Sequence, residues 1–146
     1  MAALILDASV LIGLLDSEDA HHEDAVEAVE LADLAARDLV TPASAYSETL
    51  VAFAGADRLA DARDAIAGMG VTVTPMNAAI AEPAATLRAS HTELRLPDAI
   101  VLATALEIDG ELMTYNQRLA KHARAHEDRT SATIRSESPD AGADPS

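Results

Sequence analysis

The stretch ALILDASVLIGLL, residues 3–15, decides the fold class. Residues 3–6 are a short apolar run that predicts a buried strand, and the apolar residues within 9–15 predict a helix. Asp7 stands at the junction between the two. A strand that leads directly into a helix is typical of an α/β domain. An acid at that junction is expected at the carboxyl edge of the sheet, where such folds bind their ligands.

Strands and helices alternate through the rest of the chain. Thr41-Pro42 is a typical helix start, with Thr as the N-cap and Pro at the first helical position. Pro83 predicts a kink or a break in its helix. The expected helices are 19–37, 42–54, 57–69, 77–91, 96–108 and 116–126, and the expected later strands are 38–41, 71–74 and 111–114. This order predicts a three-layer α/β domain with a mainly parallel sheet.

Length and composition limit the alternatives. The 146 residues predict one domain, and an apolar share of 49% is enough for a buried core. The chain has no Cys, which excludes a disulfide framework and a thiolate metal site. It has no apolar run of the ~18 residues of a membrane span, and its start lacks the basic region of a signal peptide, so we expect a cytoplasmic protein. A polar composition from residue 128 predicts an ordered domain over 1–127 and a disordered tail over 128–146.

The formal net charge is −15, from 25 acidic residues against nine Arg and one Lys. This balance counts against a nucleic-acid partner, because such proteins usually present a basic face. It has two interpretations. Many surface carboxylates and little Lys are typical of proteins adapted to a very salty cytoplasm, where salt screens charge repulsion. The alternative is an ordinary acidic, Arg-rich protein from a GC-rich genome.

Three acids are candidates for chemistry, and each has a structural alternative. Asp7 closes the first strand, but Asp is also a favoured N-cap for the helix that follows. Glu48 lies on a small, apolar helix face with no Arg or Lys within four residues, which predicts half burial and a metal partner; alternatively it points into water. Asp98 opens the strongly apolar stretch DAIVLATALEI, where an acid also stabilises the helix dipole.

An amide completes the candidate site. Asn116 follows the expected strand 111–114, where it lies near the acids or simply caps the next helix. Thr114 beside it is placed to hydrogen-bond a metal-bound water. Oxygen ligands without Cys or a well-placed His favour a hard cation, Mg²⁺ or Mn²⁺.

Four motifs carry a family resemblance: LDASVLIGLLD (6–16), SETL (47–50), LPDAIVLATALEIDGELMT (96–114) and TYNQRLA (114–120). As a set they resemble the PIN-domain ribonuclease family, and most closely its VapC-type toxins, over about residues 1–125. The resemblance implies a three-layer PIN-like fold with a four- or five-stranded, mainly parallel sheet flanked by helices. It also implies that acids bind one or two divalent metal ions for the hydrolysis of RNA phosphodiesters.

Carried onto this chain, the resemblance makes Asp7 and Asp98 the principal metal ligands. Glu48 becomes a third acid that binds metal directly or through water. Asn116 stands where many family members have a fourth acid, so the sequence departs from the pattern. This departure puts the second metal ion in doubt and implies a lower metal affinity. The hydroxyl residues that would orient acids and waters near the site are Ser9 and Thr114.

The same resemblance implies three partners: an RNA substrate, a cognate antitoxin and a second copy of the chain in a homodimer. One basic stretch follows Asn116, and on a helix the side chains at positions 118, 121 and 124 share a face that is suited to phosphates or is simply solvated. The residues of this stretch are Arg118, Lys121, Arg124 and Arg129.

Two other classes of function remain. A PIN-like module that binds RNA or protein with weak or no cleavage is favoured by Asn116 and the acidic composition. Phosphoryl chemistry on another α/β scaffold is disfavoured, because Asp7-Ala8-Ser9 lacks the second acid of a phosphatase motif and Lys121 is misplaced for a receiver domain. Nucleotide-binding Gly motifs are absent. His122 and His126 have the i, i+4 spacing of metal ligands, but the neighbouring sequence offers no third one.

Overall fold

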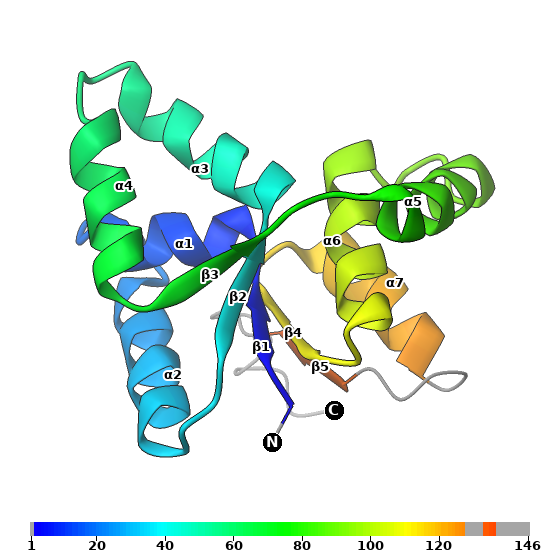
Figure 1. The fold of residues 1–146 in the computed structure, drawn as a ribbon, viewed down its shortest axis with the longest axis horizontal. Helices are drawn as coiled ribbons and strands as arrows, with labels where there is room; N and C mark the ends of the chain where they lie inside the picture. Colours follow the sequence, from blue (N-terminus) through cyan, green and yellow to red (C-terminus); the bar gives the residue numbers. More distant parts are fainter. Residues whose placement is uncertain (1, 128–132, 137–146) are drawn as a thin grey trace.

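The computed structural model describes residues 2–127 and 133–136. Five parallel strands form one sheet there, in the order β3-β2-β1-β4-β5, so β1 is central (Figure 1). The strands are β1 (Leu4–Leu6), β2 (Leu39–Pro42), β3 (Val71–Thr74), β4 (Glu111–Thr114) and β5 (Thr133–Ser136). This architecture confirms the predicted α/β fold with a parallel sheet.

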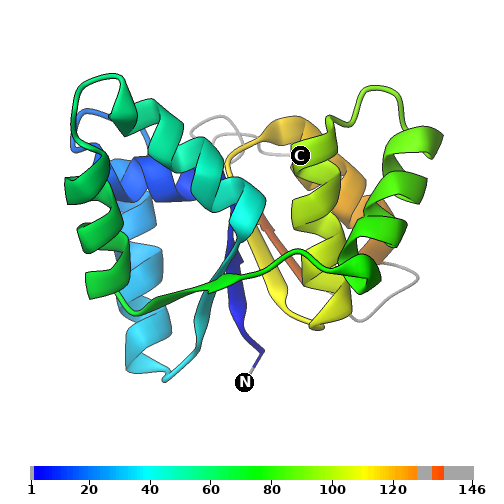
Figure 2. The same cartoon turned by 45° about the horizontal axis from the view of Figure 1, so that its top comes forward.

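Helices cover both faces of the sheet, and Figures 1 and 2 show α5, α6 and α7 on one side and α1, α2 and α4 on the other. The helices are α1 (Ala8–Leu15), α2 (His22–Leu34), α3 (Ala43–Ala54), α4 (Leu59–Gly68), α5 (Ala78–Ser90), α6 (Leu96–Glu107) and α7 (Gln117–Glu127). Within the described residues, no helix is long and apolar enough to cross a membrane.

The central strand β1 is apolar throughout because both of its faces are buried. Ile5 packs into a core shared with α5, α6 and α7, whereas Leu4 and Leu6 pack into a second core with α1, α2 and α4. All three side chains are fully buried. This alternation follows from the two-residue period of a strand, and it explains why the run carries no polar residue before Asp7.

Thr41 was predicted as a helix N-cap, and this prediction is wrong. Thr41 lies within β2, opposite Val73 of β3, and its hydroxyl donates a hydrogen bond of 2.8 Å to the carbonyl oxygen of Leu6. Pro42 takes the N-cap position of α3 instead, without a side-chain hydrogen bond. The β-branched side chain suits the strand, and the buried Leu6 carbonyl gains a donor that a capping Thr would not supply.

Pro83 does not break its helix, because α5 continues from Ala78 to Ser90. A proline inside a helix costs about 3 kcal/mol through its missing N–H and its ring. Ile80, Ala84 and Leu87 are buried in the core on one face of α5, and this packing offsets that cost.

The sequence did not predict β5, which pairs in parallel with β4 through Leu112↔Ile134 and its neighbours. It lies within the segment that was expected to be disordered, so that expectation is wrong for Thr133–Ser136. The rest of this tail, 128–132 and 137–146, lies outside the described residues.

Gly110 joins α6 to β4 beside the central strand, and replacing it by Ala should destabilise the protein by about 1–3 kcal/mol. An added Cβ would clash with Cδ1 of the buried Ile5 and lie 3.0 Å from the backbone oxygen of Ala3. Gly68→Ala is the control, because a Cβ there meets no atom within 4 Å among those described. Urea unfolding of both variants checks this. Equal midpoints for the two would contradict the crowding at Gly110.

Candidate functional site

The predicted site residues converge on one cavity of about 220 Å³ at the carboxyl ends of β1 and β4. It lies where α1 and α7 begin after these strands, with α3 and α6 forming the other walls. The polar residues that line it are Asp7, Ser9, Glu48, Arg95, Asp98 and Asn116, and the apolar ones are Ala8, Ile12, Ala45 and Val101.

Asp7 is buried, with 5% of its surface exposed, and its carboxylate accepts three hydrogen bonds. Oδ1 accepts from Ser9 Oγ at 2.6 Å and from the backbone N–H of Val10 at 3.1 Å, while Oδ2 accepts from Thr114 Oγ1. Asp7 is therefore both the N-cap of α1 and a wall of the cavity. Burial raises its pKa from 3.8 to about 6; the nearby Asp98 charge adds to this, and the hydrogen bonds oppose it.

Two hydroxyls hold Asp7 in place. Ser9 Oγ accepts a 3.0 Å hydrogen bond from the backbone N–H of Tyr115, and Thr114 Oγ1 accepts one of 2.9 Å from the backbone N–H of Asn116. Because each hydroxyl accepts from an N–H, its own proton is directed to Asp7. Thr114 was expected to hydrogen-bond a metal-bound water. It is fully buried and does not line the cavity, so its role here is to orient Asp7.

Glu48 lines the cavity from α3, but it is exposed, whereas the sequence predicted half burial. The buried face of α3 carries Ala45, Thr49 and Phe53, which places Glu48 at the rim. The pKa of Glu48 is raised above 4.5, first by desolvation and then by the charge of Asp98, while Arg95 lowers it.

Asp98 lies in the first turn of α6 and is half buried. Its Oδ2 atom is buried and finds no hydrogen-bond partner in the described part of the chain. Burial raises the pKa of Asp98, and the positive charges of Arg95 and Arg118 oppose that rise. A buried carboxylate oxygen without a partner is costly, so its presence here points to a cation as the missing partner.

The donor set fits a hard divalent cation. Three carboxylates border one small cavity, and the pKa of each is raised, first by desolvation. Carboxylate oxygens are the ligands that Mg²⁺ and Mn²⁺ prefer. Asp7, Asp98 and Glu48 would hold such an ion, and it would supply the partner that Asp98 Oδ2 lacks.

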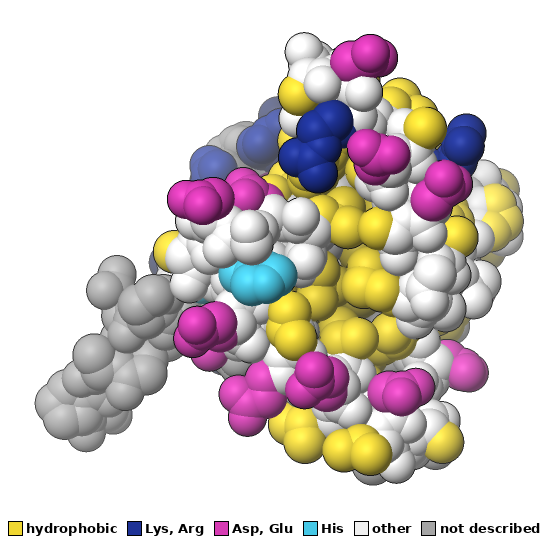
Figure 3. Space-filling view, turned by 90° about the vertical axis from the view of Figure 1, so that its left-hand side faces the viewer, with side chains coloured by type: hydrophobic (Ala, Val, Ile, Leu, Met, Phe, Trp, Pro, Cys, Tyr) yellow, Lys and Arg dark blue, Asp and Glu magenta, His cyan; other side chains and the backbone are white. Residues whose placement is uncertain are grey.

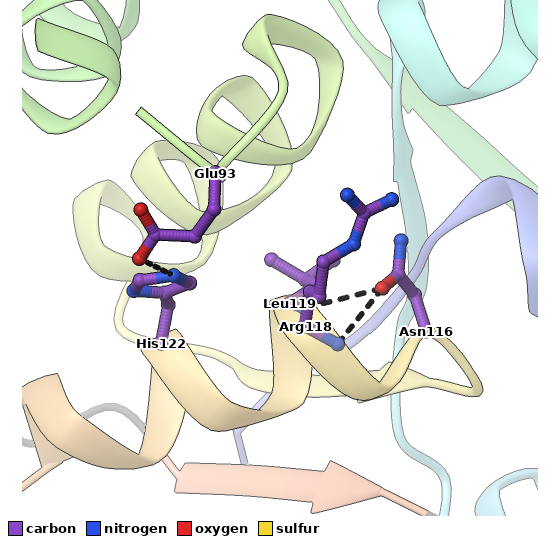
Figure 4. A network of polar contacts seen from close by, with 5 residues as sticks. All are labelled: Glu93, Asn116, Arg118, Leu119 and His122. Atoms are coloured by element: carbon purple, nitrogen blue, oxygen red, sulfur yellow. Dashed lines mark hydrogen bonds and ion pairs between the residues drawn. The ribbon is translucent and has the colours of Figure 1, made fainter. Parts of the chain in front are cut away.

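Asn116 caps helix α7, as its structural alternative predicted. Its Oδ1 accepts hydrogen bonds from the backbone N–H groups of Arg118 at 3.0 Å and Leu119 at 3.2 Å (Figure 4). Only an oxygen can accept from two N–H donors, so the amide nitrogen is the atom left for the cavity. Asn116 therefore offers the cavity a hydrogen-bond donor, whereas the family resemblance implied an oxygen ligand.

The sequence missed Arg95 as a site residue. Arg95 lines the cavity directly before α6, and its charge lowers the pKa of both Glu48 and Asp98. Its place three residues before Asp98 was the available signal. Of the predicted basic stretch, Arg118 acts on Asp98, while Lys121 and Arg124 are exposed further along α7 and do not line the cavity.

Asn116→Asp should raise Mn²⁺ affinity about tenfold, because Asp caps α7 equally well and adds a carboxylate oxygen to the cavity. Asn116→Ala removes the cap and should cost about 1 kcal/mol of stability without any gain in metal binding. Mn²⁺ titration by calorimetry and urea unfolding measure the two effects. Unchanged Mn²⁺ affinity in the Asp variant would show that position 116 does not face the ion.

The fold and the facing carboxylates define an α/β protein with an acid-lined site at the carboxyl edge of a parallel sheet. Residues 4–125 match the model of the PIN domain, so the chain belongs to the PIN-domain family. No curated protein matches the chain.

Solved structures with the same fold include toxins with their antitoxins. A toxin–antitoxin complex from Klebsiella pneumoniae is 26% identical, covers 80% of this chain and 88% of its own, and has a TM-score of 0.64. VapBC2 from Rickettsia felis, bound to a promoter DNA fragment, is 10% identical. The match covers 93% of this chain and 99% of that one, with a TM-score of 0.70. VapC20 from Mycobacterium tuberculosis, a sarcin–ricin loop cleaving toxin, is 16% identical. The match covers 82% of this chain and 95% of that one, with a TM-score of 0.67.

Proposed function

We propose that this chain is a VapC-type toxin that hydrolyses RNA phosphodiesters with a bound Mg²⁺ or Mn²⁺ ion. The observation that carries the proposal is the buried, unpartnered Oδ2 of Asp98 beside Asp7 and Glu48 in one cavity, as far as the described residues show. A binding module that never held a cation would have little reason to keep a buried carboxylate oxygen without a partner among three neighbouring acids.

When bound, a divalent cation lowers the pKa of a water molecule and offsets the charge that develops on the phosphoryl oxygens. Asp7 and Asp98 would hold the ion, and Ser9 and Thr114 orient the Asp7 carboxylate through hydrogen bonds to its two oxygens. Glu48 stands at the solvent-exposed rim, where its carboxylate holds a water by accepting a hydrogen bond.

The donors around the cavity suit the RNA backbone. Arg95 lines the cavity, so its guanidinium group is placed to contact a phosphate held there, and the charge of Arg118 lowers the pKa of Asp98 from nearby. The amide nitrogen of Asn116 adds a neutral donor to a phosphate oxygen. In a protein of net charge −15, these donors and a bound cation would offset the repulsion between the site's three carboxylates and RNA phosphates.

A different face suits an antitoxin. Figure 3 looks onto the side of α2, α3 and α4 and shows an area of apolar side chains with acids along its lower border and both acids and Lys or Arg above it. A cavity of about 270 Å³ there is lined by Val29, Leu39 and Met69, with Glu30 and Asp33 beside them. Apolar side chains of a cognate antitoxin would pack against the apolar lining of this cavity, and basic ones would pair with Glu30 and Asp33. RNA phosphates would be repelled by the same two acids. We also expect a homodimer, which light scattering of the purified protein would detect.

Cleavage of total cellular RNA by the purified, untagged protein tests the function. The assay runs with Mg²⁺, with Mn²⁺ or with EDTA, from low to several-molar KCl, because the salt in which an acidic protein works is part of the question. Cleavage that requires the ion supports the proposal. RNA binding without cleavage by the folded, metal-supplied protein would favour the non-catalytic module, and cleavage in EDTA would overturn the metal site.

A further inference from the structure

A second cluster of metal-binding side chains lies outside the acidic cavity. His91, Glu93 and His122 each offer a ligand atom, and these atoms all lie within 4.8 Å of one another. His91 ends α5 and Glu93 lies in the connector to α6, whereas His122 lies on α7. Glu93 Oε1 and His122 Nε2 are 2.9 Å apart, and Figure 4 shows this contact between the connector and the helix.

The fold supplies the ligand that the local sequence lacked. His122 and His126 lie one turn apart on α7, a spacing that places two imidazoles on one side of a helix. His91 lies against both, with its ring centroid 4.8 Å from that of His122 and 6.1 Å from that of His126. His91, Glu93 and His122 therefore meet at one place, and the ring of His126 lies beside that of His91.

We propose that His91, Glu93 and His122 bind a divalent transition-metal ion of the Zn²⁺ type, with His126 as the fourth ligand. This ligand set differs from the acidic cavity in its chemistry. Imidazole nitrogen favours Zn²⁺, Co²⁺, Ni²⁺ and Cu²⁺, whereas Mg²⁺ prefers oxygen ligands alone. Three His and one Glu meet the four-coordinate preference of Zn²⁺.

The separations are compatible with such an ion after small movements. With Zn–N distances near 2.0–2.1 Å, tetrahedral ligand atoms are about 3.3 Å apart. The ligand atoms of His91, Glu93 and His122 lie within 4.8 Å of one another, so closing these three around an ion takes about 1.5 Å at most. The Glu93 side chain is 57% exposed and is able to move, while that of His122 is 11% exposed and anchors the site.

An ion here would join two segments that also carry residues of the acidic cavity or its surroundings. Glu93 lies two residues before Arg95, which lines the cavity, and His122 lies one turn after Arg118 on α7. A metal bond between the connector and α7 would hold these two arginines at a fixed separation. The role is structural, since none of the four ligands lines the cavity.

Co²⁺ binding to untagged protein with Asp7→Asn and Asp98→Asn tests the site, because these substitutions disable the carboxylate cavity. We expect one Co²⁺ per chain, with visible absorption bands from nitrogen ligands, and a rise in Tm of several degrees at saturating Zn²⁺. His91→Asn and Glu93→Gln, which alter partly exposed side chains, should each weaken binding about tenfold to a hundredfold. His122→Ala should abolish it, provided the variant is folded by circular dichroism.

Matched controls are His22→Asn, which alters an imidazole of similar exposure on α2, and Glu82→Gln on the surface of α5. Both should leave Co²⁺ binding unchanged. The proposal fails if the background protein binds no Co²⁺. It also fails if His91→Asn and Glu93→Gln bind as tightly as the controls. Because the readout is metal binding in a protein without a nuclease site, its outcome is independent of the proposed ribonuclease activity.

Discussion

Asp98→Asn should reduce metal-dependent RNA cleavage by about a thousandfold or more while the fold is kept. The substitution preserves the size of the side chain and removes the charge whose buried Oδ2 has no hydrogen-bond partner in the described chain. Loss of one principal ligand weakens both the binding of the ion and its stabilisation of the developing phosphoryl charge. Initial cleavage rates at saturating Mn²⁺ measure the effect, and circular dichroism verifies the fold.

Asp61→Asn is the matched control, because Asp61 is also an acid in the first turn of a helix but is exposed on α4. It removes the same helix-dipole interaction and should leave cleavage unchanged. Glu48→Gln should have a smaller effect than Asp98→Asn, about tenfold to a hundredfold, since Glu48 stands at the rim. Cleavage at the wild-type rate by Asp98→Asn would rule out Asp98 as a ligand.

Asp7→Asn should stabilise the metal-free protein at pH 7.5 by about 3 kcal/mol. The folded state raises the pKa of Asp7 from 3.8 to about 6, and one pKa unit corresponds to about 1.36 kcal/mol. Between these values the folded chain binds more protons than the unfolded chain, so wild-type stability falls as the pH rises from about 4 to 6. Above that range Asp7 is ionised in both states, so the loss of stability that its burial causes no longer changes with pH.

The difference in unfolding free energy between Asp7→Asn and wild type should therefore be small near pH 4 and reach its full size above pH 6. Urea unfolding in EDTA across pH 4–8 measures it, and taking the difference cancels the other acids. Saturating Mg²⁺ should restore stability to the wild type and much less to the variant, because bound ligand stabilises the folded state. An Asp7→Asn protein less stable than wild type at pH 7.5 would contradict the burial cost.

The central part of the fold was predictable because its signals are local. The apolar run before Asp7 and the apolar helix after Asp98 are buried on all sides, and such segments appear in the sequence as continuous hydrophobic stretches. Parallel strands then bring their carboxyl ends together whatever the surface composition. Asp7 and Asn116 meet for this reason, because each closely follows a strand. Asp98 joins them from α6, which follows α5 and not a strand, so its place depends on helix packing.

The remaining features depend on packing between distant segments. Whether Thr41 caps a helix or bonds the Leu6 carbonyl is decided by the β1–β2 pairing, which a local motif does not contain. The exposure of Glu48 depends on how α3 lies across the end of the sheet. The imidazole cluster depends on the approach of His91 to His122, and the residues around either one alone predict no site.

The acid site is assembled from the two ends of the domain. Asp7 is held by Thr114, 107 residues later in the chain, and the central strand is paired with a β4 that follows at the same distance. During synthesis, the Asp7 carboxylate therefore gains its contact with Thr114 only after β4 has been made. For the proposed ribonuclease, this order of synthesis means that a growing chain still attached to its ribosome and messenger lacks a complete site until α7 has emerged.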